Sequence, residues 1–398
     1  MNKNLNELGV IHYGKDYKSN PTGDDIPIYG TGGIMGYTSL SLNSGPAVLT
    51  GRKGSINNPI YVEGDFWNVD TIFCIKPFND VDPKWLYYNF LNTDLNKLNE
   101  ATGVPSVNTQ SLYRLKFNFF EKPQQRKIAQ ILSTVDAVLE KTEAAITKYQ
   151  RLKQGLMHDV FTRGIDVHTG QLRPKQTQAP ELYKQSALGW IPMEWEVISI
   201  QEFASKSNYA IVDGPFGSNL KSIHYRTKGY PIIQSGFVTS NKFIANKYLY
   251  VDKEKYYSEI RSSVKGGDIV MAKIGAQCGT CAILPINHPD GILAGNCLKI
   301  SVDKDNNVEF LLHVLHSYRK KGILDLITST TAQPAISMAS LKVMEIPRPS
   351  LKEQNQIAKK LQSIDQKIHT EQQALAKYQQ LKAGLLQDLL TGKVEVSV

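Results

Sequence analysis

The feature that most constrains the fold of this chain is an internal repeat. Residues 125–162 align without a gap with residues 354–391, and 15 of the 38 aligned positions are identical. In both copies, apolar residues recur at spacings of three and four, which is the period of a helix with one buried stripe. The repeat therefore predicts two long helices of the same design.

The ends of both helices carry start and stop signals. Pro123 suits a first helical turn, and Ser350 with Glu353 fits a capping box. Gly164 and Gly392 follow the last periodic residues, where helices commonly end. A helix of this length, roughly 57 Å, cannot bury its apolar stripe alone, so we expect the two to pack on each other as an antiparallel coiled coil.

Each long helix is preceded by a similar order of shorter elements. Short apolar runs broken by Gly, Pro, Asn and Asp, such as residues 27–37 and 230–237, predict strands and turns. A shorter helical pattern follows in each half, beginning near Asp82 and near Phe310. Within the second half, Asp213-Gly214 predicts a hairpin turn.

We therefore predict an α+β chain with internal pseudo-two-fold symmetry. Two similar strand-rich domains, each with a short helix, are joined by the two long helices. The predicted boundaries are 1–122 for the first domain, 123–163 for the first long helix, 164–187 for a polar linker, 188–349 for the second domain, and 350–398 for the second long helix and tail.

Composition indicates what kind of partner the chain binds and in which cellular compartment it works. The chain has a net charge of +9 and a pI near 9.1, which favours phosphate-bearing partners. Its four cysteines are too few for a disulfide framework. No apolar run reaches the roughly 18 residues of a membrane span, and the first residues lack the apolar core of a secretory signal. We expect a cytoplasmic protein that does not associate with membranes.

Catalytic and metal-binding motifs are absent from the sequence. No stretch matches the phosphate loop GxxxxGK[ST], and the glycines of residues 30–36 miss the GxGxxG spacing of a dinucleotide site. Cys278 and Cys281 form a C-x-x-C pair that, with His288 and Cys297, resembles a zinc site. Because this run looks like a strand and its counterpart in the first half has no cysteine, we expect core residues and no metal site.

Four segments resemble the DNA-specificity (S) subunit of Type I restriction-modification enzymes. They are TGRKGSI (50–56), LGWIPMEWEV (188–197), DGPFGSNLK (213–221) and RPSLKEQNQIAKKL (348–361). The resemblance covers essentially the whole chain in the family's order, except that the first domain lacks an opening like residues 188–197.

The resemblance implies a non-catalytic subunit of a DNA adenine methyltransferase and restriction complex. Each target recognition domain would read one half of a bipartite, asymmetric site in double-stranded DNA, and the paired helices would set the spacer and hold two methyltransferase subunits. This chain would bind no cofactor itself. S-adenosylmethionine would belong to the methyltransferase partner, and ATP and magnesium would belong to the restriction/translocase partner.

Loops that combine glycine with basic, amide or hydroxyl side chains suit contacts with phosphates and base edges. On this ground we predict the DNA-binding residues Lys15, Tyr17, Lys18, Thr31, Tyr37, Arg52, Lys53, Ser55, Asn108, Lys206, Asn208, Tyr209, Phe216, Ser218, Asn219, Lys221, Gln234, Ser235, Lys273 and Gln277. For the partner-subunit interface we predict residues of the two long helices, namely Val138, Tyr149, Tyr378, Leu381, Leu385, Leu386, Leu389 and Leu390.

Two other classes of function stay open at this point. The chain could be a non-catalytic coiled-coil scaffold whose globular ends bind proteins, which salt-dependent DNA binding would argue against. It could also be a nuclease whose carboxylates the sequence does not bring together. Metal-dependent cleavage by the isolated chain would favour that alternative.

Overall fold

The computed structural model describes residues 2–215, 217–329 and 332–397, which form two compact units. Unit 1 comprises Met1–Ile146 with Thr370–Val398, and unit 2 comprises Thr147–His369. The long helices are α3 (Lys122–Thr162) and α8 (Leu351–Leu390), and each belongs partly to unit 1 and partly to unit 2. Over the described residues, no helix is both long and apolar enough to span a membrane.

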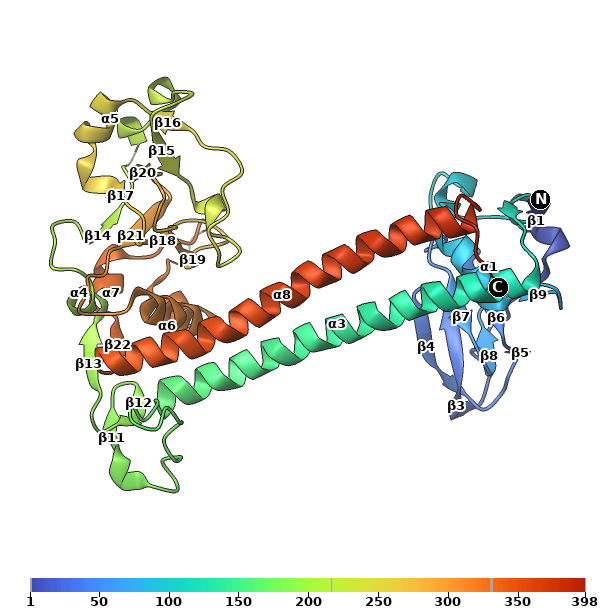
Figure 1. Ribbon diagram of the computed structural model, residues 1–398, viewed down its shortest axis with the longest axis horizontal. Helices are drawn as coiled ribbons and strands as arrows, with labels where there is room; N and C mark the ends of the chain where they lie inside the picture. Colours follow the sequence, from blue (N-terminus) through green and yellow to red (C-terminus); the bar gives the residue numbers. More distant parts are fainter. Residues whose placement is uncertain (1, 216, 330–331, 398) are drawn as a thin grey trace. The chain divides into compact units, whose positions relative to one another are not determined.

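Unit 1 is built on two four-stranded sheets (Figure 1). The first sheet is antiparallel throughout, in the order β2 (Gly9–Tyr13), β9 (Ile72–Pro77), β6 (Ala47–Gly51) and β7 (Ile60–Val62). The second sheet has the order β4 (Gly33–Thr38), β3 (Thr22–Gly30), β8 (Asp65–Asn68) and β5 (Asn43–Ser44). In this sheet β3 and β8 run parallel. The unit also contains the antiparallel pair β1 (Asn2–Asn4) and β10 (Lys116–Asn118), and the helices α1 (Pro83–Leu91) and α2 (Thr109–Tyr113).

Unit 2 repeats this topology strand for strand. Its first sheet is again antiparallel, in the order β14 (Ile211–Asp213), β21 (Cys297–Ile300), β18 (Ile269–Ala272) and β19 (Cys281–Ile283). Its second sheet has the order β16 (Tyr250–Val251), β15 (Tyr230–Ile233), β20 (Gly291–Leu293) and β17 (Ser263–Val264). Here β15 and β20 are the parallel pair.

The remaining elements of unit 2 also follow unit 1. The counterparts of β1, β10, α1 and α2 are β13 (Glu196–Ser199), β22 (Glu345–Arg348), α6 (Val308–Lys320) and α7 (Met338–Val343). Unit 2 also contains the helices α4 (Ile200–Phe203) and α5 (Lys253–Ser258), and the hairpin of β11 (Tyr183–Ser186) and β12 (Gly189–Pro192). The predicted duplication of two strand-rich domains is confirmed, with the same strand order in both.

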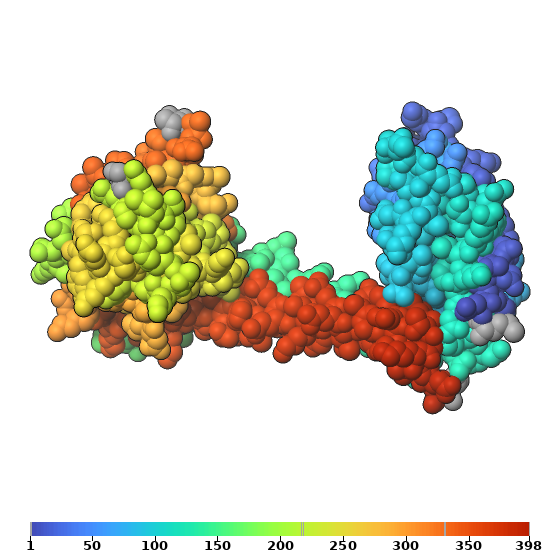
Figure 2. All heavy atoms as spheres, turned by 90° about the horizontal axis from the view of Figure 1, so that it is seen from above, coloured from blue at the N-terminus to red at the C-terminus, as the bar shows by residue number. Residues whose placement is uncertain are grey.

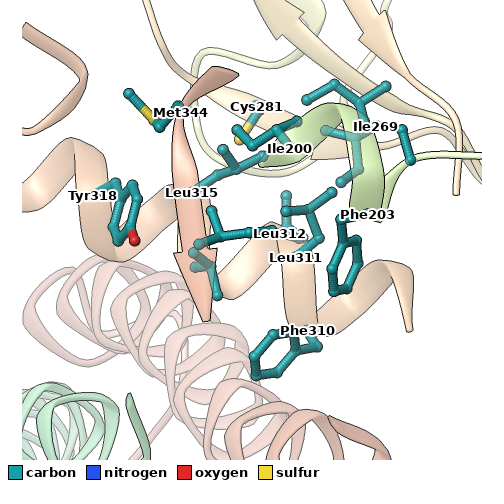
Figure 3. Packing of buried hydrophobic residues seen from close by; sticks show 14 of the residues in the cluster. Ile200, Phe203, Ile269, Cys281, Phe310, Leu311, Leu312, Leu315, Tyr318 and Met344 are labelled. Atoms are coloured by element: carbon teal, nitrogen blue, oxygen red, sulfur yellow. The ribbon is translucent and has the colours of Figure 1, made fainter. Parts of the chain in front are cut away.

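In each unit, an apolar core joins the first sheet and the short helix to the segments of α3 and α8 that belong to that unit. In unit 2, α6 packs against the first sheet, and the ring of Phe310 stacks on Phe203 with a centroid distance of 6.1 Å. Figure 3 shows these rings beside Ile269 of the sheet. Ile357 and Leu361 of α8 are buried in the same cluster. The corresponding cluster of unit 1 includes Ile75, Trp85, Phe90, Ile128, Leu132 and Leu389.

Two ion pairs fix the register of the long helices. Lys153 Nζ lies 2.6 Å from Asp365 Oδ1 within unit 2, and Lys382 Nζ lies 2.6 Å from Asp136 Oδ1 within unit 1. The two lysines are equivalent in the repeat, and so are the two aspartates. Because residue 136 pairs with 382 while residue 153 pairs with 365, α3 and α8 run antiparallel, as predicted.

A buried glutamine links the start of each long helix to the short helix of its unit. Gln125 Oε1 accepts a hydrogen bond from Asp82 N at 2.7 Å, and Gln354 Oε1 accepts one from Asn307 N at 2.8 Å. Asp82 and Asn307 are the N-caps of α1 and α6. Since the two glutamines are equivalent in the repeat, the same contact is built twice.

The predicted capping box of α8 forms only in part. Ser350 Oγ accepts a hydrogen bond from Glu353 N at 3.4 Å, but the Glu353 carboxylate turns into the core of unit 2. There it binds Arg173 Nη1 at 2.6 Å and accepts hydrogen bonds from Trp195 Nε1 at 3.0 Å and Ile165 N at 2.7 Å. A guanidinium is a stronger partner for a carboxylate than one backbone N–H, which explains the departure.

The segment predicted as a linker, residues 164–187, is folded. Ile165 forms a β-bridge with Leu172, and both Ile165 and Arg173 are buried. The segment ends in β11, which pairs with β12. Although the segment is polar in composition, one buried arginine and a few apolar side chains suffice to dock it on the first turn of α8.

Candidate nucleic-acid interface

In unit 1, the loop that follows β6 gathers several predicted DNA-binding residues. Lys53 forms a β-bridge with Ser106, and Gly54 N donates to Pro105 O at 2.8 Å. Gly54 has a φ of +92°, and a Cβ built there would lie 3.4 Å from Thr31 Oγ1. The loop therefore brings Thr31 together with Arg52, Lys53 and Ser55, and the glycine permits the close approach.

Arg52 is held in place at the base of this loop. Its Nη1 donates to Asp70 O at 3.1 Å, and its guanidinium lies 5.6 Å from the ring centroid of Tyr13. Lys53 and Ser55 are exposed beside it. A positioned guanidinium next to an exposed ammonium suits contact with phosphates or with guanine.

Unit 2 builds the same loop after β18. Gly275 has a φ of +99° and its N donates to Pro334 O at 2.8 Å, as Gly54 N does to Pro105 O. Ile336 N donates to Lys273 O at 3.0 Å, just as Val107 N donates to Arg52 O in unit 1. Lys273 therefore occupies the position of Arg52.

Lys273 itself is not a surface cation, and its predicted contact with phosphate stays a prediction. It is buried, and its Nζ lies 2.6 Å from Asp213 Oδ2. Burial alone would raise the pKa of Asp213, but hydrogen bonds from Lys273 and Arg261 outweigh it and lower that pKa. The buried ammonium is therefore neutralised by a carboxylate inside unit 2.

Asp213 and Gly214 do not form the predicted hairpin turn. Asp213 is the last residue of β14 and pairs with Leu298 of β21. A Cβ on Gly214 would lie 2.0 Å from Ala294 O, so the glycine is required by a close approach of two segments. Its role is therefore packing between segments far apart in the sequence.

Arg261 is a candidate that the sequence did not reveal. Its side chain is half exposed, and its Nη2 donates to Asp213 Oδ1 at 3.0 Å. The carboxylate thus holds one donor of an arginine that stays half exposed. Nothing in the sequence around residue 261 marks it, because its partner is 48 positions away.

The other predicted residues of unit 1 fall into two groups. Lys15, Lys18 and Tyr37 are exposed, and Tyr17 is half-buried against the core. Asn108 is committed to its own unit: its Oδ1 accepts from Ser111 N at 2.7 Å as the N-cap of α2, and its Nδ2 donates to Glu100 Oε1 at 2.6 Å. A helix-capping role explains Asn108 without DNA.

The remaining predicted residues of unit 2 lie mostly at the surface. Ser235 Oγ accepts a hydrogen bond from Asn296 Nδ2 at 2.8 Å, and Gln234 beside it is half-buried. Tyr209 is exposed in the left-handed conformation with a φ of +62°. Phe216 lies outside the described residues, and Ser218 lies in the short turn of residues 217–219. The exposed group comprises Lys206, Asn208, Tyr209, Asn219, Lys221 and Gln277.

The predicted partner surface on the long helices is only partly free. Leu389 and Leu390 are buried in the core of unit 1, which explains both residues by packing, and Leu385 and Leu386 pack against the same core. The half-buried residues Val138, Tyr149 and Tyr378 lie along the helix pair.

Leu381 is an accessible apolar residue of α8, the helix drawn in red in Figure 2. Its side chain is 51% exposed. Leu152, its equivalent in the repeat, is also 51% exposed on α3.

The cysteines pack as core side chains. Cys281 is fully buried in β19, and burial raises the pKa of its thiol to about 12. Cys278 Sγ donates to Lys273 O at 2.9 Å. Within the described part of the chain, no three His, Cys, Asp or Glu side chains gather as a metal site would require.

Comparisons with known proteins agree on one family. The model of the Type I restriction modification DNA specificity domain matches residues 1–148 and 192–380. The Type I restriction enzyme MjaVIII specificity subunit of Methanocaldococcus jannaschii is 26% identical over 357 residues, which cover 88% of this chain and 76% of that protein. The EcoBI specificity subunit of Escherichia coli is 22% identical over 365 residues, covering 87% and 73%.

Solved structures support the fold. The S subunit of a Type I restriction-modification system from M. genitalium superposes with a TM-score of 0.66 at 16% identity, covering 100% of this chain and 96% of that one. A chain from a structure of type I R-M complex assembly and conformational transition gives 0.53 at 15% identity, covering 98% and 97%. With the family model matching most of its length, the chain belongs to the Type I restriction-modification DNA specificity family.

Proposed function

We propose that this chain is the DNA-reading subunit of a Type I restriction-modification complex and that each unit recognises one half of a split, asymmetric sequence. The observation that carries the proposal is the difference between equivalent positions of one scaffold. Where unit 1 presents Arg52 beside the Tyr13 ring, unit 2 keeps the equivalent Lys273 paired with Asp213 and presents the half-exposed Arg261 on the same carboxylate. Base edges are distinguished by the donors and acceptors that side chains present to them, so two such units read different bases.

The paired helices are proposed to set the unread spacer and to hold two methyltransferase subunits. Leu152 and Leu381 support this, because they are equivalent in the repeat and equally exposed, one on each long helix. Two equivalent docking points suit two copies of one partner.

The catalytic steps are proposed to be carried out by the partner subunits. The methyltransferase subunits would bind S-adenosylmethionine and methylate adenine, and the restriction/translocase subunits would use ATP and magnesium. This chain would contribute DNA recognition and assembly, without a catalytic group or cofactor of its own, in the cytoplasm.

A genome-wide map of adenine methylation tests the proposal. Cells would express the chain with the methyltransferase encoded beside it, and a second culture would express the methyltransferase alone. A split, asymmetric motif that appears only with this chain supports the proposal. If no motif appears although the two proteins associate, the chain is a scaffold that does not read DNA.

A variant assigns each half-site to a unit. Replacing both Arg52 and Lys53 with alanine changes the loop of unit 1 and leaves unit 2 intact. We expect relaxed recognition in one half of the motif and an unchanged other half. Equal relaxation of both halves would contradict recognition by separate units.

A further inference from the structure

Unit 2 contains a groove that is lined by none of the predicted DNA-binding residues. Its volume is about 1300 Å³, and it is lined by α6, by the parts of α3 and α8 in unit 2, and by the loop at residues 240–242. This volume is ample for a nucleotide-sized ligand.

The groove is strongly basic. Its acidic lining residues are Glu309 and Asp365, and Asp365 is paired with Lys153 at 2.6 Å. Burial raises the pKa of Glu309, which disfavours its negative charge. The cations come from all four lining segments and are Arg151, Lys153, Lys242, Arg319, Lys320 and Lys359. Such convergence favours a compact anion.

A buried histidine, His313, lines the same groove. The His313 side chain is only 3% exposed, and neither ring nitrogen has a hydrogen-bond partner among the described residues. Burial, together with nearby Lys153 and His316, lowers the pKa of His313 to about 3, so the ring is neutral and carries one N–H donor. Buried polar groups without a partner are rare in folded proteins.

In unit 1, the position equivalent to His313 is occupied by a tyrosine with a structural role. His313 follows the N-cap of α6 by six residues, as Tyr88 follows the N-cap of α1. Tyr88 Oη donates to Asp136 Oδ2 at 2.7 Å, and Asp136 is the repeat equivalent of Asp365. The shorter imidazole in unit 2 replaces this phenol and makes no such bond within the described chain.

We infer that the groove of unit 2 binds a phosphate group, which accepts a hydrogen bond from His313 and is neutralised by the surrounding lysines and arginines. The phosphate can come from a free nucleotide or from a nucleic-acid backbone, and both present the same anionic oxygens. The inference goes beyond the proposed reading of bases and does not depend on it.

Calorimetric titration of the full chain tests the inference with three probes: inorganic phosphate, adenosine diphosphate, and an oligo(dA)·oligo(dT) duplex. Lys359→Ala removes a cation of the groove, and Lys360→Ala is the matched control because it is the next residue of α8, is exposed, and does not line the groove. We expect Lys359→Ala to weaken binding about tenfold and Lys360→Ala to change it less than about twofold.

His313→Tyr gives a second test, because it copies the arrangement of unit 1. The phenol is expected to reach Asp365, so the variant should fold while losing the binding that Lys359→Ala weakens. Binding of phosphate and adenosine diphosphate would identify a free ligand, and a Lys359-specific effect on the duplex alone would identify a nucleic-acid backbone. If no probe binds, or if the two lysine variants bind all probes equally, the inference is wrong.

Discussion

Removing the Glu353 carboxylate is expected to destabilise unit 2 more than any comparable change at its surface. Glu353 is 2% exposed and binds Arg173, which is itself buried. The variant Glu353→Leu leaves the guanidinium with one exposed partner, Glu194, and leaves the N–H groups of Trp195 and Ile165 without their acceptor. Breaking a buried ion pair in this way costs about 3 to 5 kcal/mol.

The assay is hydrogen exchange in increasing urea, followed in the peptides that contain Ile165 and Trp195, because this reports on unit 2 rather than on the whole chain. Glu194→Ala is the matched control. It removes the other carboxylate from the same arginine, but Glu194 is 76% exposed, so the expected loss is below about 1 kcal/mol.

A double variant separates the buried charge from the lost packing. Arg173→Met combined with Glu353→Leu should be less destabilised than Glu353→Leu alone, because no unpaired charge stays buried. Equal losses for Glu353→Leu and Glu194→Ala would refute the reasoning, since burial would then not decide the strength of the pair.

Three other predictions concern Arg52, the paired helices and Asp213. Arg52→Ala should weaken DNA binding and reduce its salt dependence by about one phosphate contact, and an unchanged affinity across a salt series would remove Arg52 from the interface. Inserting one helical turn, about four residues, near both Thr142 and Glu371 should lengthen the paired helices by about 6 Å and widen the unread spacer in the methylated motif; an unaltered spacer would contradict a measuring role. Because the pKa of Asp213 is lowered in the folded chain, its stabilising effect is complete above its unfolded-state pKa of about 4 and is lost as the pH falls further. Asp213→Asn should therefore destabilise the chain at neutral pH, with a difference in unfolding free energy that shrinks in acid; a constant difference would argue against the ion pair.

Much of the fold could be predicted from the sequence because the repeat is local and periodic. A helical stripe needs only neighbours three and four positions away, so both long helices were visible in the sequence. In the repeat, Asp136 is equivalent to Asp365 and Lys153 is equivalent to Lys382. The aspartate of each copy pairs with the lysine of the other copy. The similar order of shorter elements before each long helix was enough to predict two like domains.

Most individual roles in the candidate site were decided by tertiary structure. Lys273 and Asp213 are 60 positions apart, and Arg173 and Glu353 are 180 positions apart. No local pattern distinguishes such a buried lysine from a surface one, so Lys273 was assigned to DNA by its loop alone. Leu389 and Leu390 fit an exposed helix face equally well until the core of unit 1 covers them.

The sequence by itself therefore determined the two helices, their antiparallel pairing and the duplication of the strand-rich units, because these depend on periodicity and on identity between the copies. Only the tertiary structure decided which charges are neutralised, which leucines stay accessible, and that His313, at the position of Tyr88, has no hydrogen-bond partner in the described part of the chain. Those properties depend on the environment of a side chain, which is assembled from segments far apart in the sequence and is not encoded in its immediate neighbours.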